Sequence, residues 1–270
     1  MRIRNREFDV DDHTYIMGIL NVTPDSFSDG GKYNTWDKAL FRAQEMIKEG
    51  ADILDIGGES TRPGHIQISE EEEIERTAPL LRRLRETFEI PLSIDTYKTA
   101  VAREALDAGA DLVNDIWGLK YEPGMGELIA KSGAACCLMH NRREPAKENL
   151  IEEVKADLKE TLSLAQKAGI HKDRILLDPG IGFGKTYQQN LEALYFLEQL
   201  KELGYPLLLG ASRKSVVGLT LDLPVEERLE GTLVTTVFGV LKGCAFIRVH
   251  DVKENVRAVR MARAICDGWR

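Results

Sequence analysis

Short apolar runs alternate with longer amphipathic segments along the whole chain. The short runs are apolar at consecutive positions, which is typical of parallel strands that are buried on both faces. They predict strands at residues 15–20, 53–56, 92–94, 112–114, 135–139, 175–177, 207–209 and 246–249. The segments between them are predicted helices, as in the stretch where Leu40, Ala43 and Ile47 fall on one face.

A strand–helix unit recurs in the chain. Residues 50–55 (GADILD) resemble residues 109–114 (GADLVN), and residues 133–137 and 243–248 are looser copies. Eight such units without a linker or a change in composition favour a single domain over residues 1–270, with an α/β fold that closes into a (β/α)8 barrel. A doubly wound open sheet is the alternative, because periodicity alone does not close a sheet.

Two segments are expected to have structural roles only. The short segment before Tyr15 lies outside the eight units, and we expect it to cover the bottom of the barrel. Ser69 and Glu72 have the spacing of a capping box. The acidic run at 70–73 is therefore interpreted as a solvated helix start that faces the positive end of the helix dipole, and not as a metal site.

The composition excludes several classes of protein. The 270 residues are 43% hydrophobic and 30% charged, which is enough apolar material for a sizeable core and excludes wholesale disorder. With 36 Lys and Arg against 44 Asp and Glu, the formal charge is −8, and no basic block is present. We therefore expect neither a nucleic-acid partner nor a membrane partner. An anionic substrate would need cations placed locally.

The N-terminal residues and the cysteines indicate a cytoplasmic location. Residues 1–10 lack the apolar core of a signal peptide, and no apolar run is long enough to cross a bilayer. The four cysteines, Cys136, Cys137, Cys244 and Cys266, have neither a CxxC spacing nor a spacing typical of metal sites. We interpret them as core thiols in a reducing compartment.

Polar residues follow every predicted strand. In a (β/α)8 barrel the carboxyl ends of the strands surround one mouth, where active sites lie. Asp95 or Asn114 alone could equally be a helix cap, so only the joint pattern favours a shared site. The residues that the strands deliver are Asn21, Asp55, Asp95, Asn114, Asp115, His140, Asp178, Ser212, Arg213, Lys214, Arg248 and His250.

Three loops at strand ends have distinctive sequences. Residues 21–31 (NVTPDSFSDGG) form either a long surface connection or a mobile lid that excludes water, and residues 57–64 (GGESTRPG) form a second such loop. Residues 178–186 (DPGIGFGKT) fail as a P-loop, because position 179 is proline where glycine is needed. Their glycines are expected to bring the backbone close to a flat ligand.

The chemistry of these side chains is mixed. Arg248 and His250 are two residues apart on one strand and can point the same way, so with Lys214 they predict an anion site. Acidic and amide groups deeper in the mouth suit a neutral heterocycle with several N–H donors. Asn21 offers a hard oxygen to Mg²⁺, which takes one or two protein ligands when it is bound to a diphosphate. We predict a group transferase that binds a donor-rich ring and a metal-bound diphosphate.

These motifs resemble those of the bacterial dihydropteroate synthases. The matching segments stand in the family's order from about residue 16 onward, at 21–31, 55–63, 93–96, 114–115, 177–185, 212–215 and 248–252. The resemblance implies a TIM barrel that joins 6-hydroxymethyl-7,8-dihydropterin diphosphate to p-aminobenzoate and releases pyrophosphate in folate biosynthesis. It also implies Mg²⁺ as cofactor, competition by sulfonamides, and a homodimer formed through helices late in the chain.

The resemblance further implies a role for each site residue. The residues that would hold the pterin are Asp95, Asn114, Met139, Asp178 and Lys214. Asn21 would bind Mg²⁺ and, with Arg248 and His250, the diphosphate. The p-aminobenzoate pocket would contain Phe27, Thr61, Arg62, Pro63, Phe183, Lys214 and Ser215. The expected catalytic residues are Asp25, Asp55, Lys214, Arg248 and His250.

One segment departs from the family pattern. Residues 141–143 (NRR) stand where many members carry a Met and Gly turn, which leaves the shape of this loop open.

Two other functions are alternatives to the synthase. A pterin-dependent methyltransferase would bind a pterin similarly but would not need the diphosphate cations or the loop at 21–31. A catalytically silent paralogue would bind pterin without turnover, although Asp25, Thr61 and Arg62 are all present.

Overall fold

All eight predicted strands are present, and strands that are consecutive along the chain pair side by side. The computed structural model describes residues 1–22, 32–59 and 67–268. The strands are β3 (Tyr15–Asn21), β4 (Ile53–Gly57), β5 (Leu92–Asp95), β6 (Leu112–Asp115), β7 (Ala135–Met139), β8 (Ile175–Asp178), β9 (Leu208–Leu209) and β10 (Phe246–Val249). Each differs from its predicted bounds by no more than a residue at either end.

The sheet closes on itself. Its order is β8-β7-β6-β5-β4-β3-β10-β9, and neighbouring strands are parallel. A parallel bridge between Leu177 and Leu207 joins the two ends of the sheet. The strands therefore form the predicted (β/α)8 barrel, and the doubly wound open sheet is excluded because its edges would remain apart.

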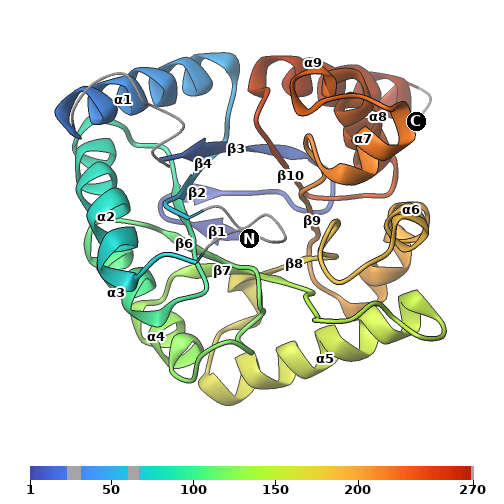
Figure 1. Cartoon of the computed structure of the whole chain (residues 1–270), viewed down its shortest axis with the longest axis horizontal. Coiled ribbons are helices and arrows are strands. Elements are labelled where there is room, and N and C mark those ends of the chain that lie inside the picture. Colours follow the sequence, from blue (N-terminus) through green and yellow to red (C-terminus); the bar gives the residue numbers. More distant parts are fainter. Residues whose placement is uncertain (23–31, 60–66, 269–270) are drawn as a thin grey trace.

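The helices form a ring around the barrel (Figure 1). They are α1 (Lys32–Glu49), α2 (Glu70–Thr87), α3 (Thr99–Asp107), α4 (Met125–Ser132), α5 (Leu150–Ala168), α6 (Tyr187–Tyr195), α7 (Ser215–Leu221), α8 (Leu229–Leu241) and α9 (Val252–Asp267). Short 3-10 turns, η2 (Lys172–Arg174), η3 (Leu197–Leu203) and η4 (Val225–Glu227), complete the connections.

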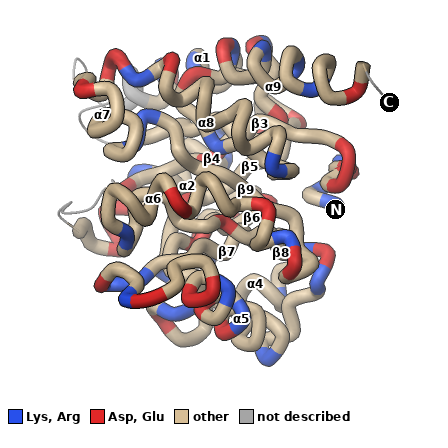
Figure 2. The backbone as a smooth tube through the Cα atoms, turned by 90° about the vertical axis from the view of Figure 1, so that its right-hand side faces the viewer, with Lys and Arg blue, Asp and Glu red and all other residues tan. Residues whose placement is uncertain are grey.

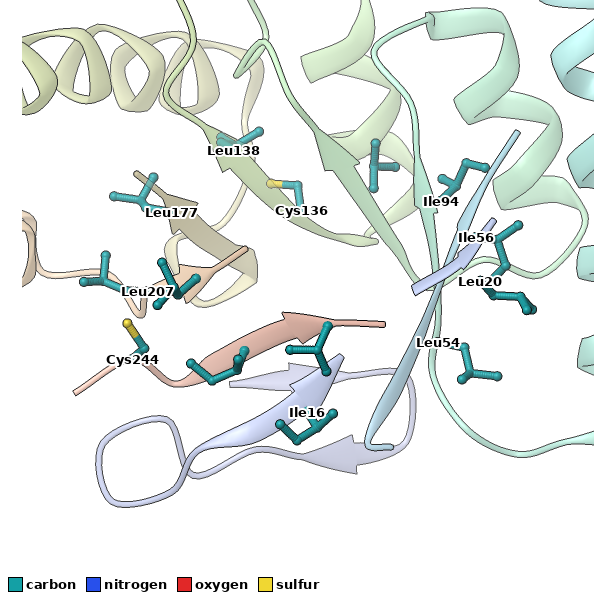
Figure 3. Close-up of a cluster of buried hydrophobic side chains, with 14 of the residues drawn as sticks. Ile16, Leu20, Leu54, Ile56, Ile94, Cys136, Leu138, Leu177, Leu207 and Cys244 are labelled. Carbon is teal, nitrogen blue, oxygen red and sulfur yellow. The ribbon is translucent and has the colours of Figure 1, made fainter. Parts of the chain in front are cut away.

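One face of each strand packs against this ring of helices. Ile16 and Leu20 of β3 and Leu54 and Ile56 of β4 belong to a buried layer that also contains Ala43 of α1. Figure 3 shows several members of this layer on neighbouring strands. Burying a side chain such as Leu or Ile contributes about 1.5–3 kcal/mol each, so this layer is the main reason that the barrel holds its helices.

The other face of the strands forms a second core inside the barrel, and the N-terminal segment seals it. The short antiparallel strands β1 (Arg2–Ile3) and β2 (Arg6–Glu7) carry Ile3 and are followed by Phe8. Both side chains are buried in one cluster with Met17, Ile53 and Phe246, which come from the amino ends of the barrel strands. The prediction that this segment covers the barrel bottom is confirmed.

The charged residues are spread over the helices. Figure 2 shows acidic and basic residues interspersed in that view, without a face of one sign. Among the described helices, none combines the length and the apolar character needed to cross a membrane.

Candidate active site

Arg248 of β10 lies between two carboxylates from other strands. Its Nε donates to Asp55 Oδ2 at 2.6 Å, and its Nη2 donates to Asp95 Oδ2 at 2.7 Å. Asn114 Nδ2 donates to Asp95 Oδ1 at 3.3 Å and to Asp55 Oδ2 at 3.4 Å. Four predicted site residues, from β4, β5, β6 and β10, therefore form one network in the mouth of the barrel.

This network is buried, and its burial shifts the pKa values. Asp55 is fully buried and Asp95 is 4% exposed. Burial raises the pKa of Asp95 to about 7, against the opposing effect of Arg248. Burial acts to lower the pKa of Arg248, but the charges of Asp55 and Asp95 outweigh it and raise that pKa above its ordinary value. Arg248 therefore remains a cation, while Asp95 is placed to titrate near neutral pH.

The network has unused hydrogen-bonding capacity. The contacts with the two carboxylates use two of the five N–H groups of the Arg248 guanidinium. Asp55 Oδ1 is buried, and no group in the described part of the chain hydrogen-bonds to it. A ligand that brings both acceptors and N–H donors would complement these groups.

Asp178 and Lys214 lie beside this network. Asp178 Oδ1 accepts a hydrogen bond from Gly180 N at 2.7 Å, and burial raises the pKa of its carboxyl, against the effect of Lys214. The Lys214 ammonium donates to Ile181 O and lies 4.7 Å from the centre of the Phe183 ring. Burial lowers the pKa of Lys214 to about 8, with Asp178 opposing the shift.

The loops after β9 and β10 are tied together. Ser212 Oγ and His250 Nδ1 are 3.0 Å apart, and Arg213 binds Asp251 through Nε at 2.9 Å and through Nη2 at 2.5 Å. Lys214 is the residue that precedes α7, and Ser215 is the first residue of that helix. The two pairs join the loop that carries Lys214 to the loop that carries His250.

Asn21 stands at the end of β3, close to Asp95. A Cβ built on Gly57 would lie 3.0 Å from Asn21 Oδ1 and 3.9 Å from Asp95 Oδ2, so two oxygens approach the same glycine. No group of three or more His, Cys, Asp or Glu side chains that could hold a metal occurs in residues 1–22, 32–59 and 67–268. Among the described residues, Asn21 Oδ1 is a hard oxygen of the kind that Mg²⁺ takes when a diphosphate supplies other ligands.

Apolar side chains form one wall of the mouth. Met139, at the end of β7, is 3% exposed and clusters with Tyr97 and Ile116, and Trp117 and Phe183 pack against this cluster. The wall therefore offers flat and polarisable surface beside the polar network. Together they suit a planar heterocycle with polar edges.

Similarity to known proteins extends over almost the whole chain. A family model described as pterin binding enzyme matches residues 17–250. The chain is 58% identical over 266 residues to the dihydropteroate synthase of Clostridium beijerinckii, covering 98% of this chain and 99% of that one. The chain belongs to the dihydropteroate synthase family. It is thus a transferase of folate biosynthesis, as its motifs predict.

Solved structures of this family match the whole barrel. A Clostridium difficile dihydropteroate synthase crystallised with pteroic acid is 50% identical, with a TM-score of 0.93, covering 96% of this chain and 99% of that one. A Xanthomonas albilineans dihydropteroate synthase with 4-aminobenzoic acid is 42% identical, with a TM-score of 0.90, covering 94% of each chain. These matches to solved structures also confirm the predicted barrel fold.

Some predicted site residues lie outside the described part of the chain. They are Asp25, Phe27, Thr61, Arg62 and Pro63. The other predicted site residues surround the mouth, at the carboxyl ends of strands β3 to β10 or in the loops that follow them. Their roles toward each substrate remain predictions at this point.

Two polar residues at strand ends do not join the mouth network as expected. Asp115 accepts hydrogen bonds from the backbone N–H groups of Trp117 at 2.8 Å and Leu119 at 2.7 Å. Successive residues of a strand point to opposite faces, so Asn114 reaches the mouth while Asp115 folds back on its own loop. His140 is buried and contacts Asp157 of α5 and Lys185.

Two of the glycines after β8, Gly180 and Gly184, have a structural reason in addition to the expected ligand contact, which stays a prediction. A Cβ on Gly180 would lie 1.9 Å from His140 O, and one on Gly184 would lie 2.3 Å from Arg142 O. Both glycines have positive φ angles, of 69° and 54°. They let the turn after β8 (residues 179–186) pack closely against the loop at 141–143, whose shape the sequence left open.

The acidic run at the start of α2 was only partly interpreted correctly. Ser69 Oγ accepts a hydrogen bond from Glu72 N at 3.2 Å, so the predicted N-cap is confirmed, but the Glu72 side chain pairs with Arg76 and does not complete the capping box. Glu73, however, is not solvated. It is 1% exposed and pairs with Lys98 Nζ at 2.8 Å, and Glu59 binds the same ammonium at 2.6 Å.

This buried ion cluster was missed from the sequence. Lys98 Nζ also donates to Ile68 O at 2.7 Å, and Tyr97 OH donates to Glu59 Oε1 at 2.6 Å. The cluster joins the loop after β5 to residue 59 and to residues 67–68. Nothing in the sequence pattern pairs a lysine of one repeat with glutamates of another, so no signal was available.

Proposed function

We propose that the mouth network binds the pterin diphosphate and that p-aminobenzoate enters beside Phe183 and Lys214. The reaction joins 6-hydroxymethyl-7,8-dihydropterin diphosphate to p-aminobenzoate and gives 7,8-dihydropteroate and pyrophosphate. The observation that carries this proposal is the position of Arg248, a buried cation held by Asp55 and Asp95 next to Asn114. Relatives crystallised with pteroic acid and with 4-aminobenzoic acid support both substrates.

The pterin lies in the deeper part of the mouth. Asp95, Asp178 and the side-chain oxygen of Asn114 offer acceptors to the N–H groups of the ring, and all three side chains are buried. Lys214 donates to a ring acceptor, and Met139 packs against the ring face. The site rejects analogues that lack these N–H groups, because buried acceptors would then be left unpaired.

The diphosphate lies toward the cations. Arg248 and His250, on β10 and just after it, bind phosphate oxygens, and charge-assisted hydrogen bonds of this kind are stronger than neutral ones. Asn21 supplies an oxygen ligand to the Mg²⁺ that accompanies the diphosphate. When bound, Mg²⁺ neutralises part of the charge that builds up on the leaving pyrophosphate.

The arylamine binds at the outer part of the mouth. Phe183 packs against its ring, and Lys214 and Ser215 at the start of α7 bind its carboxylate. By resemblance to the family, Phe27, Thr61, Arg62 and Pro63 complete this pocket, and Asp25 belongs to the loop that covers it. Sulfonamides, which have a similar ring and anionic group, compete at the same place.

The chemical step breaks the C–O bond to the diphosphate and forms a C–N bond to the arylamine. The leaving group takes the electron pair of the C–O bond, and positive charge develops on the pterin methylene. The Asp55 carboxylate favours this charge because it lies in a buried site, where electrostatic interactions are strong. The arylamine attacks as a neutral nucleophile and then loses a proton, so no covalent enzyme intermediate is needed.

A coupled assay tests this function. The chain is incubated with the pterin diphosphate and Mg²⁺, with and without p-aminobenzoate, and pyrophosphate and 7,8-dihydropteroate are both measured. We expect release of pyrophosphate to require p-aminobenzoate and to match the product one to one. Release without the arylamine would indicate a hydrolase, and pterin binding without turnover would indicate the silent paralogue. Methyl transfer from a methylated pterin would indicate the methyltransferase.

We also propose that the chain forms a homodimer through α6, α7 and α8. These helices enclose an apolar groove of about 600 Å³, with Tyr195, Val234 and Phe238 among the residues that line it. Tyr195 and Val234 are 59% and 62% exposed, which is unusual for clustered large apolar side chains in a monomer. A second copy of the chain, docked with two-fold symmetry, would cover the same patch on both subunits.

Light scattering coupled to size exclusion tests the dimer. We expect wild type to have twice the mass of one chain and Val234→Asp to be monomeric. Phe41→Asp is the matched control, because Phe41 is 63% exposed on α1 and lies outside the groove. A monomeric wild type would refute the dimer.

We propose that the protein is located in the cytoplasm. All four cysteines are free, and three of them are buried, which suits a reducing compartment.

A further inference from the structure

The turn after β8 is folded around the side chain of Lys185. Its Nζ donates to Gly180 O at 2.9 Å and to Phe183 O at 3.2 Å, and it lies 2.8 Å from His140 Nδ1. Burial lowers the pKa of Lys185 to about 7, against the effect of Asp178. In its protonated form the side chain has three N–H donors, and here each has an acceptor. Lys185 therefore ties the beginning and the middle of the turn to the end of β7.

His140 has one tautomer that satisfies all its contacts. Asp157 Oδ2 is a carboxylate oxygen and can only accept, so His140 Nε2 carries the proton and donates to it at 3.0 Å, which leaves Nδ1 to accept from Lys185 Nζ. The ring is buried, and burial lowers the pKa of His140 to about 4, against the effect of Asp157, which keeps the ring neutral. Asp157 lies on α5, and Arg142 also binds it, at 3.0 Å.

The turn that Lys185 holds carries groups of the candidate site. Phe183 is part of it, and Ile181 O accepts a hydrogen bond from the Lys214 ammonium that lies over the Phe183 ring. The turn has little room to move, because Gly180 and Gly184 press against the backbone of residues 140 and 142. A change in the turn would therefore displace the Phe183 ring and the Lys214 ammonium together.

We propose that Lys185, oriented by the His140–Asp157 pair, is a positioning residue for the p-aminobenzoate subsite. It does not touch the reacting atoms. It fixes the turn so that Phe183 and Lys214 stand ready for the ring and the carboxylate of the arylamine, which lowers the cost of ordering them on binding. This inference rests on the proposed function, since it takes the roles of Phe183 and Lys214 from there.

The test is steady-state kinetics of the full chain with both substrates varied. In Lys185→Met the side chain keeps its bulk but loses all three donors. We expect the KM for p-aminobenzoate to rise at least tenfold, because Phe183 and Lys214 both move. The KM for the pterin diphosphate should change less than threefold, because that substrate loses only its contact with Lys214 and keeps those with Asp95, Asn114 and Arg248. Asp157→Ala should raise the KM for p-aminobenzoate two- to fivefold in the same selective way, because the imidazole loses its orienting partner.

Lys155→Met is the matched control. Lys155 is a nearly buried lysine on α5 that pairs with Glu152 and Glu202, away from the turn, so we expect both KM values to stay within twofold of wild type. If Lys185→Met does not fold, Asp157→Ala decides the question. Equal effects on both substrates, or no change in the KM for p-aminobenzoate, would overturn the proposal. Turnover by wild type in the same assay tests the proposed function separately.

Discussion

Arg248 and Asp55 are joined by an ion pair of 2.6 Å between Nε and Oδ2, although 193 residues separate them in the chain. Asp55 is on β4 and Arg248 is on β10, with β3 between them, so the pair forms only when the last strand of the barrel pairs with the first. The same guanidinium binds Asp95 of β5. The integrity of the fold and the assembly of the mouth network are therefore linked through this one side chain.

Arg248→Ala should lose both activity and stability. Removing a charged donor from the path of the leaving diphosphate is expected to lower kcat/KM for the pterin diphosphate by about 100- to 1000-fold. It also leaves Asp55 and Asp95 buried without their cation, which costs about 3–5 kcal/mol in the free energy of unfolding.

Urea unfolding and steady-state kinetics measure the two effects. Arg248→Lys is the comparison, because it keeps the charge but cannot form two separate N–H contacts in the same geometry, so an intermediate loss is expected. Wild-type kcat/KM in Arg248→Ala would show that the anion site lies elsewhere.

The pH profile of kcat/KM should be bell-shaped. Asp95, with a pKa of about 7, must be ionised to accept hydrogen bonds, so kcat/KM falls as the pH drops below 7. Lys214, with a pKa of about 8, must be protonated to donate, so kcat/KM falls as the pH rises above 8. The measurement is kcat/KM for the pterin diphosphate from pH 5.5 to 9.5, a range chosen to span the reference pKa of histidine as well.

Lys214→Arg separates the enzyme's titration from that of the substrates. Arginine stays charged over this range, so the alkaline limb should move upward by at least one pH unit while the acid limb stays. An alkaline limb that does not move in Lys214→Arg would assign it to another group.

Lys98→Met should destabilise the fold. It leaves Glu59 and Glu73, which are both almost fully buried, without the ammonium that they share. We expect a loss of about 3–5 kcal/mol in the free energy of unfolding, measured by urea denaturation. Glu73→Gln removes a charge but keeps a hydrogen-bonding group, so its loss should be about 1 kcal/mol. Equal losses of unfolding free energy in the two variants would show that the charge pairing does not account for the stability.

Phe8→Ala should affect stability alone. Phe8 is 2% exposed in the floor of the barrel, where its ring centre lies 5.4 Å from that of Phe246. Truncating a buried phenylalanine costs about 3–5 kcal/mol. Because the floor and the mouth are at opposite ends of the strands, both KM values should stay unchanged. Phe41→Ala, at an exposed site on α1, should stay within about 0.5 kcal/mol of wild type. A change in either KM would connect the floor to the site.

The sequence was sufficient to predict the strands and to select the polar residues that follow them. Strands buried on both faces have apolar runs, and glycines end the helices before them, so the number and position of the strands could be predicted from local pattern. The residues that follow those strands, such as Asp55, Asp95 and Arg248, could be selected because a barrel brings all carboxyl ends to one mouth.

The sequence determined which segments are strands and helices, and which polar residues reach the carboxyl ends of the strands. Only the tertiary structure decided the partners: that Arg248 joins Asp55 and Asp95, that Glu73 is buried against Lys98, and that His140 turns toward Lys185. The physical reason is that periodicity follows from the local geometry of the backbone. Ion pairs and tautomers depend on distances between repeats far apart in the chain, which are set only when the barrel closes.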